Sequence, residues 1–155
     1  DPSRPSLVAE NHAHVLINGA YLPGELARAD VRFRMWRRLL SGAHREERRL
    51  SRALADALAR ETGLPPYRYT GRNAVNVGGH PYLWARNLLA NRLYEPPTVF
   101  LEPYVVNSEA VYPRLQALLS ARAEGRPLPA DNLIETTARA LTAGLATYYG
   151  PPAPE

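Results

Sequence analysis

The feature that most constrains the fold is an amphipathic segment at residues 41–63, SGAHREERRLSRALADALARETG. Leu50, Leu54 and Leu58 recur at every fourth position, which places them on one face of a helix. Gly63 follows the last apolar residue of this pattern, and glycine commonly ends helices. The segment is therefore predicted to form a helix that packs one face against the rest of the chain.

Two other stretches are predicted to be strands. Residues 6–16 alternate between two sets of side chains, as expected of a strand with two different faces. Residues 98–106 form a nearly continuous apolar run, which is typical of a buried strand in a parallel sheet. Amphipathic patterns at 108–125 and 130–150 indicate two more helices.

Because strands and helices alternate, the expected class is α/β, with a mostly parallel sheet flanked by helices. Residues 1–150 are expected to form one such domain, or the C-terminal part of a larger catalytic domain. The Pro-rich residues 151–155 are expected to be a disordered tail.

The composition limits the available chemistry. The chain has 155 residues, 45% of them hydrophobic, which suffices for one core. It has no cysteine, so disulfides and thiolate metal sites are excluded and any metal ligands must be histidines or carboxylates. No stretch approaches the roughly 18 apolar residues of a membrane span. The N-terminal residues lack the basic and apolar pattern of a signal segment.

The basic residues are all arginines, 19 in number, and the formal net charge is +4. The densest run, Arg37 to Arg52, is interleaved with Glu46, Glu47 and Asp56. This spacing predicts a solvated helix face with ion pairs one turn apart, and it does not favour nucleic acid as a partner. A non-catalytic module that binds an anionic polymer through this Arg-rich surface remains an alternative.

The sequence ENHAHV offers metal-ligand side chains in a strand context. Glu10, His12 and His14 are two residues apart, so they would project from one face of a strand. Two imidazoles and a carboxylate are ligand types that suit Zn²⁺. The alternative is a polar sheet edge that carries surface histidines.

The sequence TVFLE ends an apolar strand in a carboxylate, Glu102. In open α/β sheets, reactive groups gather beyond the carboxyl ends of the strands. A glutamate there, near a metal-bound water, can accept and return a proton. The alternative is a structural glutamate that pairs with one of the arginines.

These stretches together resemble the zinc-dependent N-acetylmuramoyl-L-alanine amidases. TVFLEPYVVNSEAVYPRLQALL resembles the region of that family that carries its catalytic glutamate. LVAENHAHV is similar to the strand that ends in a histidine ligand, which corresponds to His12 here. SRALADALARETG, YLWARN and IETTARALTAGLATYYG resemble further segments of the family, in the same order. The resemblance covers most of residues 7–149.

The resemblance implies a Zn²⁺ cofactor and cleavage of the amide between muramic acid and the stem peptide of peptidoglycan. It implies that Glu102 is the general base and that Arg86 anchors a substrate carboxylate. It also implies a periplasmic or extracellular location. The expected ligands are Glu10, His12 and His14, and the expected substrate-binding residues are His80, Tyr104 and Asn107.

The chain also departs from the family pattern. The family has another histidine ligand and a glutamate ligand well before the position of His12, and only eleven residues precede His12 here. The spacing from Glu102 to Asn107 is one residue short, and Tyr104 replaces a glycine. An upstream segment or partner chain of the same precursor would complete the site, or Glu10, His12 and His14 would hold the metal alone, or the fold is an inactive relic. Another zinc hydrolase, of carboxypeptidase-like type, is a further alternative.

Overall fold

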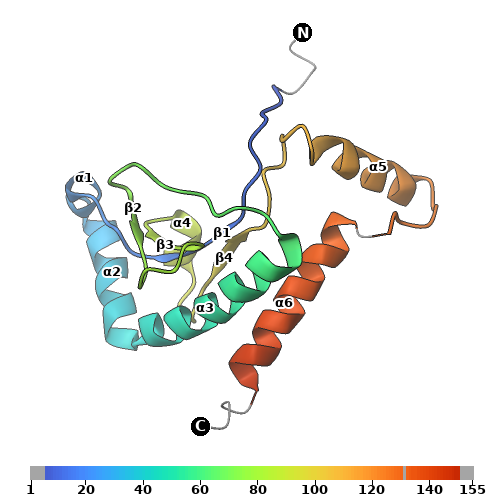
Figure 1. The fold of residues 1–155 in the computed structure, drawn as a ribbon. Coiled ribbons are helices and arrows are strands. Elements are labelled where there is room, and N and C mark those ends of the chain that lie inside the picture. The colour runs from blue at the N-terminus through green and yellow to red at the C-terminus, as the bar shows by residue number, and fades with distance from the viewer. Residues whose placement is uncertain (1–5, 131, 151–155) are drawn as a thin grey trace.

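A computed structural model of the chain describes residues 6–130 and 132–150 and shows helices around a four-stranded sheet (Figure 1). The expected tail at 151–155 lies outside the described residues. The strands are β1 (His14–Asn18), β2 (Ala74–Asn76), β3 (Leu83–Arg86) and β4 (Phe100–Glu102). The helices are α1 (Pro23–Leu26), α2 (Ala29–Ser41), α3 (Ala43–Thr62), α4 (Leu89–Leu93), α5 (Tyr112–Ala123) and α6 (Leu133–Tyr149).

The sheet has the strand order β2-β3-β1-β4 and mixed strand directions. β1 and β3 are parallel, whereas β1–β4 and β2–β3 are antiparallel. The general α/β class is therefore confirmed, but the prediction of a mostly parallel sheet is wrong. Between β2 and β3 lie only residues 77–82, and such a short connection favours an antiparallel pair because a parallel pair needs a longer crossover.

The side chains of β1 alternate between two environments. Val15 and Ile17 join the main apolar core, together with Ala55 and Leu58 of α3. His14 lies on the opposite face, because successive side chains of a strand point to opposite sides. The helix α3 therefore covers one face of the sheet, and the histidine face is left for other contacts.

The strand bounds differ from those predicted. The apolar run at 98–106 contributes only three residues to the sheet, and it forms an edge strand instead of a buried parallel one. Pro97 and Pro103 stand near its two ends, and a proline has no N–H to donate to a ladder. The side chain of Phe100 is accordingly 39% exposed. Within 6–16, most residues lie before β1, with isolated bridges from Val8 and Ala13.

The predicted helix at 41–63 is confirmed as α3, which ends at Gly63 in the left-handed conformation. Figure 1 shows α6 lying alongside α3, with α5 projecting away from both. The approach of α6 requires Gly144, because a Cβ there would lie 2.9 Å from the Cα of Leu54. No helix among the described residues is long and apolar enough to cross a lipid bilayer.

A buried ion pair joins Arg38 of α2 to Glu47 of α3. Glu47 is 1% exposed, so its predicted place on a solvated helix face is wrong. One Glu47 carboxylate oxygen also accepts a hydrogen bond of 2.9 Å from the N–H of Thr98. A guanidinium N–H of Arg38 donates to the carbonyl oxygen of Tyr94 at 2.5 Å. The pair therefore fixes the segment 94–98, which leads into β4.

Replacing Glu47 tests this junction. Glu47→Gln leaves the guanidinium of Arg38 buried without its counter-charge, and we expect the free energy of unfolding to fall by about 3–5 kcal/mol. Chemical denaturation followed by circular dichroism measures the change. Glu109 is exposed, so Glu109→Gln is the matched control and should leave the denaturation midpoint unchanged. Equal transitions for the two variants would contradict the assigned role of the pair.

Candidate functional site

A cleft of about 460 Å³ opens on the histidine face of the sheet. The pairing of β1 with β4 sets His14 directly opposite Glu102, so the two side chains share this face. The loop between α3 and β2 supplies two tyrosines, and the segment after β4 closes one side. The lining residues are Glu10, His12, His14, Tyr67, Tyr69, Arg86, Glu102, Tyr104, Val105 and Val106.

The position of Glu102 follows from the direction of β4. The sequence predicts this carboxylate at the carboxyl ends of parallel strands, and that prediction is wrong. Because β4 is antiparallel to β1, its carboxyl end meets the amino end of β1, where His14 begins the strand. The same pairing brings the segment that carries His12 and Glu10 to the mouth of the cleft.

His14 lies close to two other titratable groups in the cleft, Glu102 and Tyr69. Nε2 of His14 lies 3.4 Å from a carboxylate oxygen of Glu102 and 2.9 Å from the hydroxyl oxygen of Tyr69. The His14 side chain is 2% exposed, whereas that of Glu102 is 42% exposed. The carboxylate of Glu102 therefore contacts the buried ring of His14 and remains accessible to solvent.

The pKa of His14 is lowered from its ordinary 6.5 to about 4. Burial is the main cause, because it disfavours the charged imidazolium, and the positive charges of His12 and Arg86 add to the effect. His14 is therefore neutral near pH 7. Since a carboxylate only accepts hydrogen bonds, the tautomer with its hydrogen on Nε2 favours the contact with Glu102 and leaves a lone pair on Nδ1.

His12 lies next to His14, with 5.7 Å between the two ring centroids. Its ring also packs on Tyr67 at 4.3 Å. The Nδ1 atoms of both histidines are buried and have no hydrogen-bond partner among the described residues. Most buried polar atoms are hydrogen-bonded, so these two ring nitrogens are exceptions among the described residues.

The donor types in the cleft suit zinc, although the number of ligands falls short. Within residues 6–130 and 132–150, no three side chains of the His, Cys, Asp or Glu type are grouped closely enough to hold a metal ion. His12 and His14 supply two imidazoles, and catalytic zinc sites usually have three protein ligands. The described residues therefore offer part of such a coordination shell.

Arg86 and Tyr69 form the wall contributed by β3 and by the loop between α3 and β2. The guanidinium carbon of Arg86 lies 5.5 Å from the ring centroid of Tyr69, a cation–π distance. Burial raises the pKa of Tyr69, so its phenol stays protonated. This wall thus offers one fixed positive charge and one hydroxyl group.

Two of the predicted site residues do not line the cleft. His80 lies within 2.9 Å of Asp56 on α3, so its ring faces the helix layer. The side chain of Asn107 donates a hydrogen bond of 2.9 Å to the carbonyl oxygen of Ser6. Tyr67 and Tyr69 do line the cleft, and their sequence spacing of two residues was the available signal. From the sequence they could stack on sugars, but buried core residues are the commoner outcome for such aromatic side chains.

Comparisons with known proteins identify no relatives. No protein family, curated protein or solved structure matches this chain. The arrangement of the side chains is therefore the only structural basis for a functional proposal.

The lowered pKa of His14 predicts pH-dependent stability. Between pH 4 and 6.5 the unfolded chain binds more protons at this residue than the folded chain, so the free energy of unfolding rises with pH and levels off above 6.5. We expect a loss of about 1–3 kcal/mol on going from pH 7 to pH 4, a range that allows for solvent in the cleft.

Denaturation curves at pH 4, 5, 6 and 7 measure this dependence. His14→Gln should flatten it, whereas the exposed His44→Gln should retain the full slope. Parallel pH profiles for the wild-type chain and His14→Gln would rule out a buried neutral imidazole.

Proposed function

We propose that the chain is a zinc-dependent hydrolase of the N-acetylmuramoyl-L-alanine amidase type, acting on peptidoglycan with Glu102 as general base. The observation that carries the proposal is the grouping of His12, His14 and Glu102 in one cleft. Two potential metal ligands and a solvent-accessible carboxylate are some of the parts that zinc-dependent hydrolysis of an amide uses. The periplasmic or extracellular location that this substrate implies belongs to the same proposal.

The arrangement around Glu102 suits proton transfer. Its carboxylate is partly exposed, so a water molecule can reach it from the cleft. Because His14 is neutral near pH 7, its ring lies 3.4 Å from the carboxylate without adding a positive charge beside it. Glu102 accepts a proton from the attacking water and returns it to the leaving amine nitrogen.

His12 and His14 would hold the zinc through ring nitrogens that have no hydrogen-bond partner among the described residues. Bound Zn²⁺ supplies a lowered pKa for water and a polarised amide carbonyl. A further ligand is needed, and we propose Glu10, or an upstream segment or partner chain of the same precursor. Glu10 lines the same cleft and is therefore the candidate within this chain.

The remaining lining residues suit a peptide joined to a sugar. Arg86 presents a guanidinium group, whose planar fork pairs well with the carboxylates of a stem peptide. Tyr67 and Tyr104 offer aromatic surface for a sugar ring. A volume of about 460 Å³ is within the usual range for ligand sites.

Glu102→Gln tests the proposed base. We expect release of stem peptide from purified peptidoglycan to fall by about 10²- to 10⁴-fold, because the amide cannot accept the water proton. Circular dichroism should show an unchanged fold, and the exposed Glu109→Gln should retain activity. Full activity in Glu102→Gln would refute the role of this residue. Hydrolysis of short peptides in preference to intact peptidoglycan would instead indicate a carboxypeptidase-like enzyme.

Zinc content tests the metal independently of activity. We expect stoichiometric zinc by plasma mass spectrometry in the chain alone or in the chain with its upstream segment. His12→Ala should lose this zinc because it removes one of the two imidazoles, and His44→Ala, which alters an exposed histidine, should retain it. The absence of zinc from both forms after incubation with the metal would remove the proposal.

A further inference from the structure

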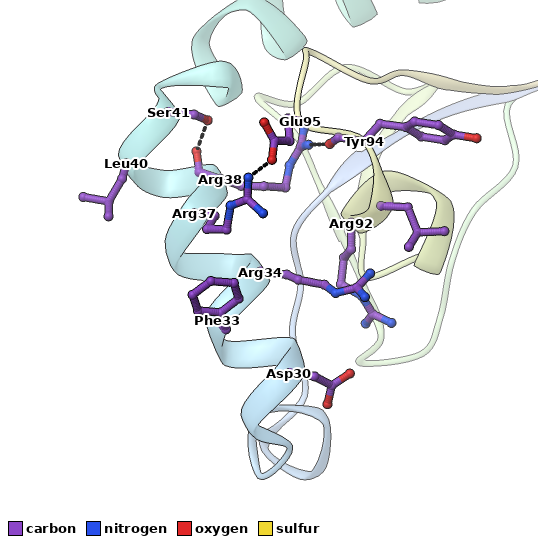
Figure 2. Close-up of a pocket in the computed structure, with 11 residues that line it drawn as sticks. Asp30, Phe33, Arg34, Arg37, Arg38, Leu40, Ser41, Arg92, Tyr94 and Glu95 are labelled. Atoms are coloured by element: carbon purple, nitrogen blue, oxygen red, sulfur yellow. Dashed lines mark hydrogen bonds and ion pairs between the residues drawn. The ribbon is translucent and has the colours of Figure 1, made fainter.

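A second cavity lies between α2 and α4, away from the histidine cleft, and its volume is about 540 Å³ (Figure 2). None of its lining residues belongs to the histidine cleft. Four of them are arginines, whereas only Asp30 and Glu95 are acidic. The arginines are Arg34, Arg37, Arg38 and Arg92.

The acidic groups around this cavity already have arginine partners. Glu95 pairs with Arg37, and the buried Glu47 pairs with Arg38. Asp30 is held by Arg28, which lies outside the lining, at 3.0 Å. The negative charge near the cavity is therefore engaged by Arg28, Arg37 and Arg38.

Arg34 and Arg92 form no ion pair among the described residues, although Arg92 interacts electrostatically with Glu25. In the described part of the chain, Arg34 has no hydrogen bond or ion pair, and Figure 2 shows it reaching from α2 toward α4. Arg92 donates to the side-chain oxygen of Asn87 at 2.6 Å, and its Nε is buried without a partner. Two guanidinium groups that border one cavity repel each other, and a bound anion would relieve this repulsion.

The rest of the cavity wall is largely apolar. Phe33 and Leu40 of α2 and Leu93 of α4 line it. Their side chains are 63%, 84% and 53% exposed, respectively. Figure 2 shows Leu40 on the side of α2 away from Arg34 and Arg92, so Phe33 and Leu93 supply the apolar surface of the cavity. The two guanidinium groups and the apolar side chains together suit a ligand that has a negatively charged end and an apolar end.

We propose that this cavity binds a small amphiphilic oxyanion, that is, a carboxylate or phosphate monoester attached to an apolar group. Arg34 and Arg92 bind the oxyanion, because a guanidinium group donates parallel hydrogen bonds to such oxygens. Phe33 and Leu93 contact the apolar group. The volume of the cavity is typical of a small-molecule site.

Titration calorimetry of the full chain with phenyl phosphate tests the proposal. Arg34→Gln and Arg92→Gln should each weaken binding by about tenfold to a hundredfold, because each removes charge-assisted hydrogen bonds. The matched control is Arg52→Gln, which removes one positive charge from an exposed position on α3 and should bind as the wild-type chain does. Equal affinities of all four proteins would overturn the assignment of the site.

Two further binding measurements test which features of the ligand the cavity recognises. Inorganic phosphate should bind more weakly than phenyl phosphate, and equal binding would overturn the apolar half of the proposal. Vesicles that contain phosphatidic acid, whose head group is a phosphate monoester, are compared with vesicles of phosphatidylcholine alone and distinguish an oxyanion on a lipid head group from a soluble one. Binding that depends on Arg34 and Arg92 in either format supports the site, and such dependence in neither format overturns it.

Discussion

The buried pair of Arg38 and Glu47 is the interaction on which the rest of the arrangement depends. It joins α2 to α3, and through the backbone of Tyr94 and Thr98 it also fixes the chain that enters β4. Since removal of one partner from a buried pair leaves an uncompensated charge, these three parts of the molecule are held together as a unit. The cavity beside α2 and the strand that carries Glu102 both depend on this junction.

The histidine cleft shows how strand direction can assemble a site. Glu102 and His14 meet because β4 returns alongside β1 in the opposite direction. The burial of His14 keeps the ring neutral, while the carboxylate beside it stays in contact with solvent. The neutral ring therefore lies beside the carboxylate of Glu102 without adding a positive charge to its surroundings.

The sequence was informative where the spacing of neighbouring residues determines the local structure. The four-residue spacing of leucines predicted α3, and the two-residue spacing in ENHAH anticipated that His12 and His14 would lie together. The sequence was uninformative where contacts between residues far apart in the chain determine the structure. The direction of β4 depends on its connection to the rest of the sheet, and the burial of Glu47 depends on Arg38 arriving from another helix. Likewise, the two-residue spacing of Tyr67 and Tyr69 does not specify the loop conformation that brings them to the cleft.

The shortness of β4 has a consequence for how this chain meets other molecules. β4 is an outer strand, so one row of its backbone groups has no neighbouring strand in the sheet. Such rows are templates on which a second polypeptide can add and start an aggregate. Here the row spans only three residues, and prolines lie near both ends. The same prolines that limit the strand therefore also discourage uncontrolled self-association through this side of the sheet.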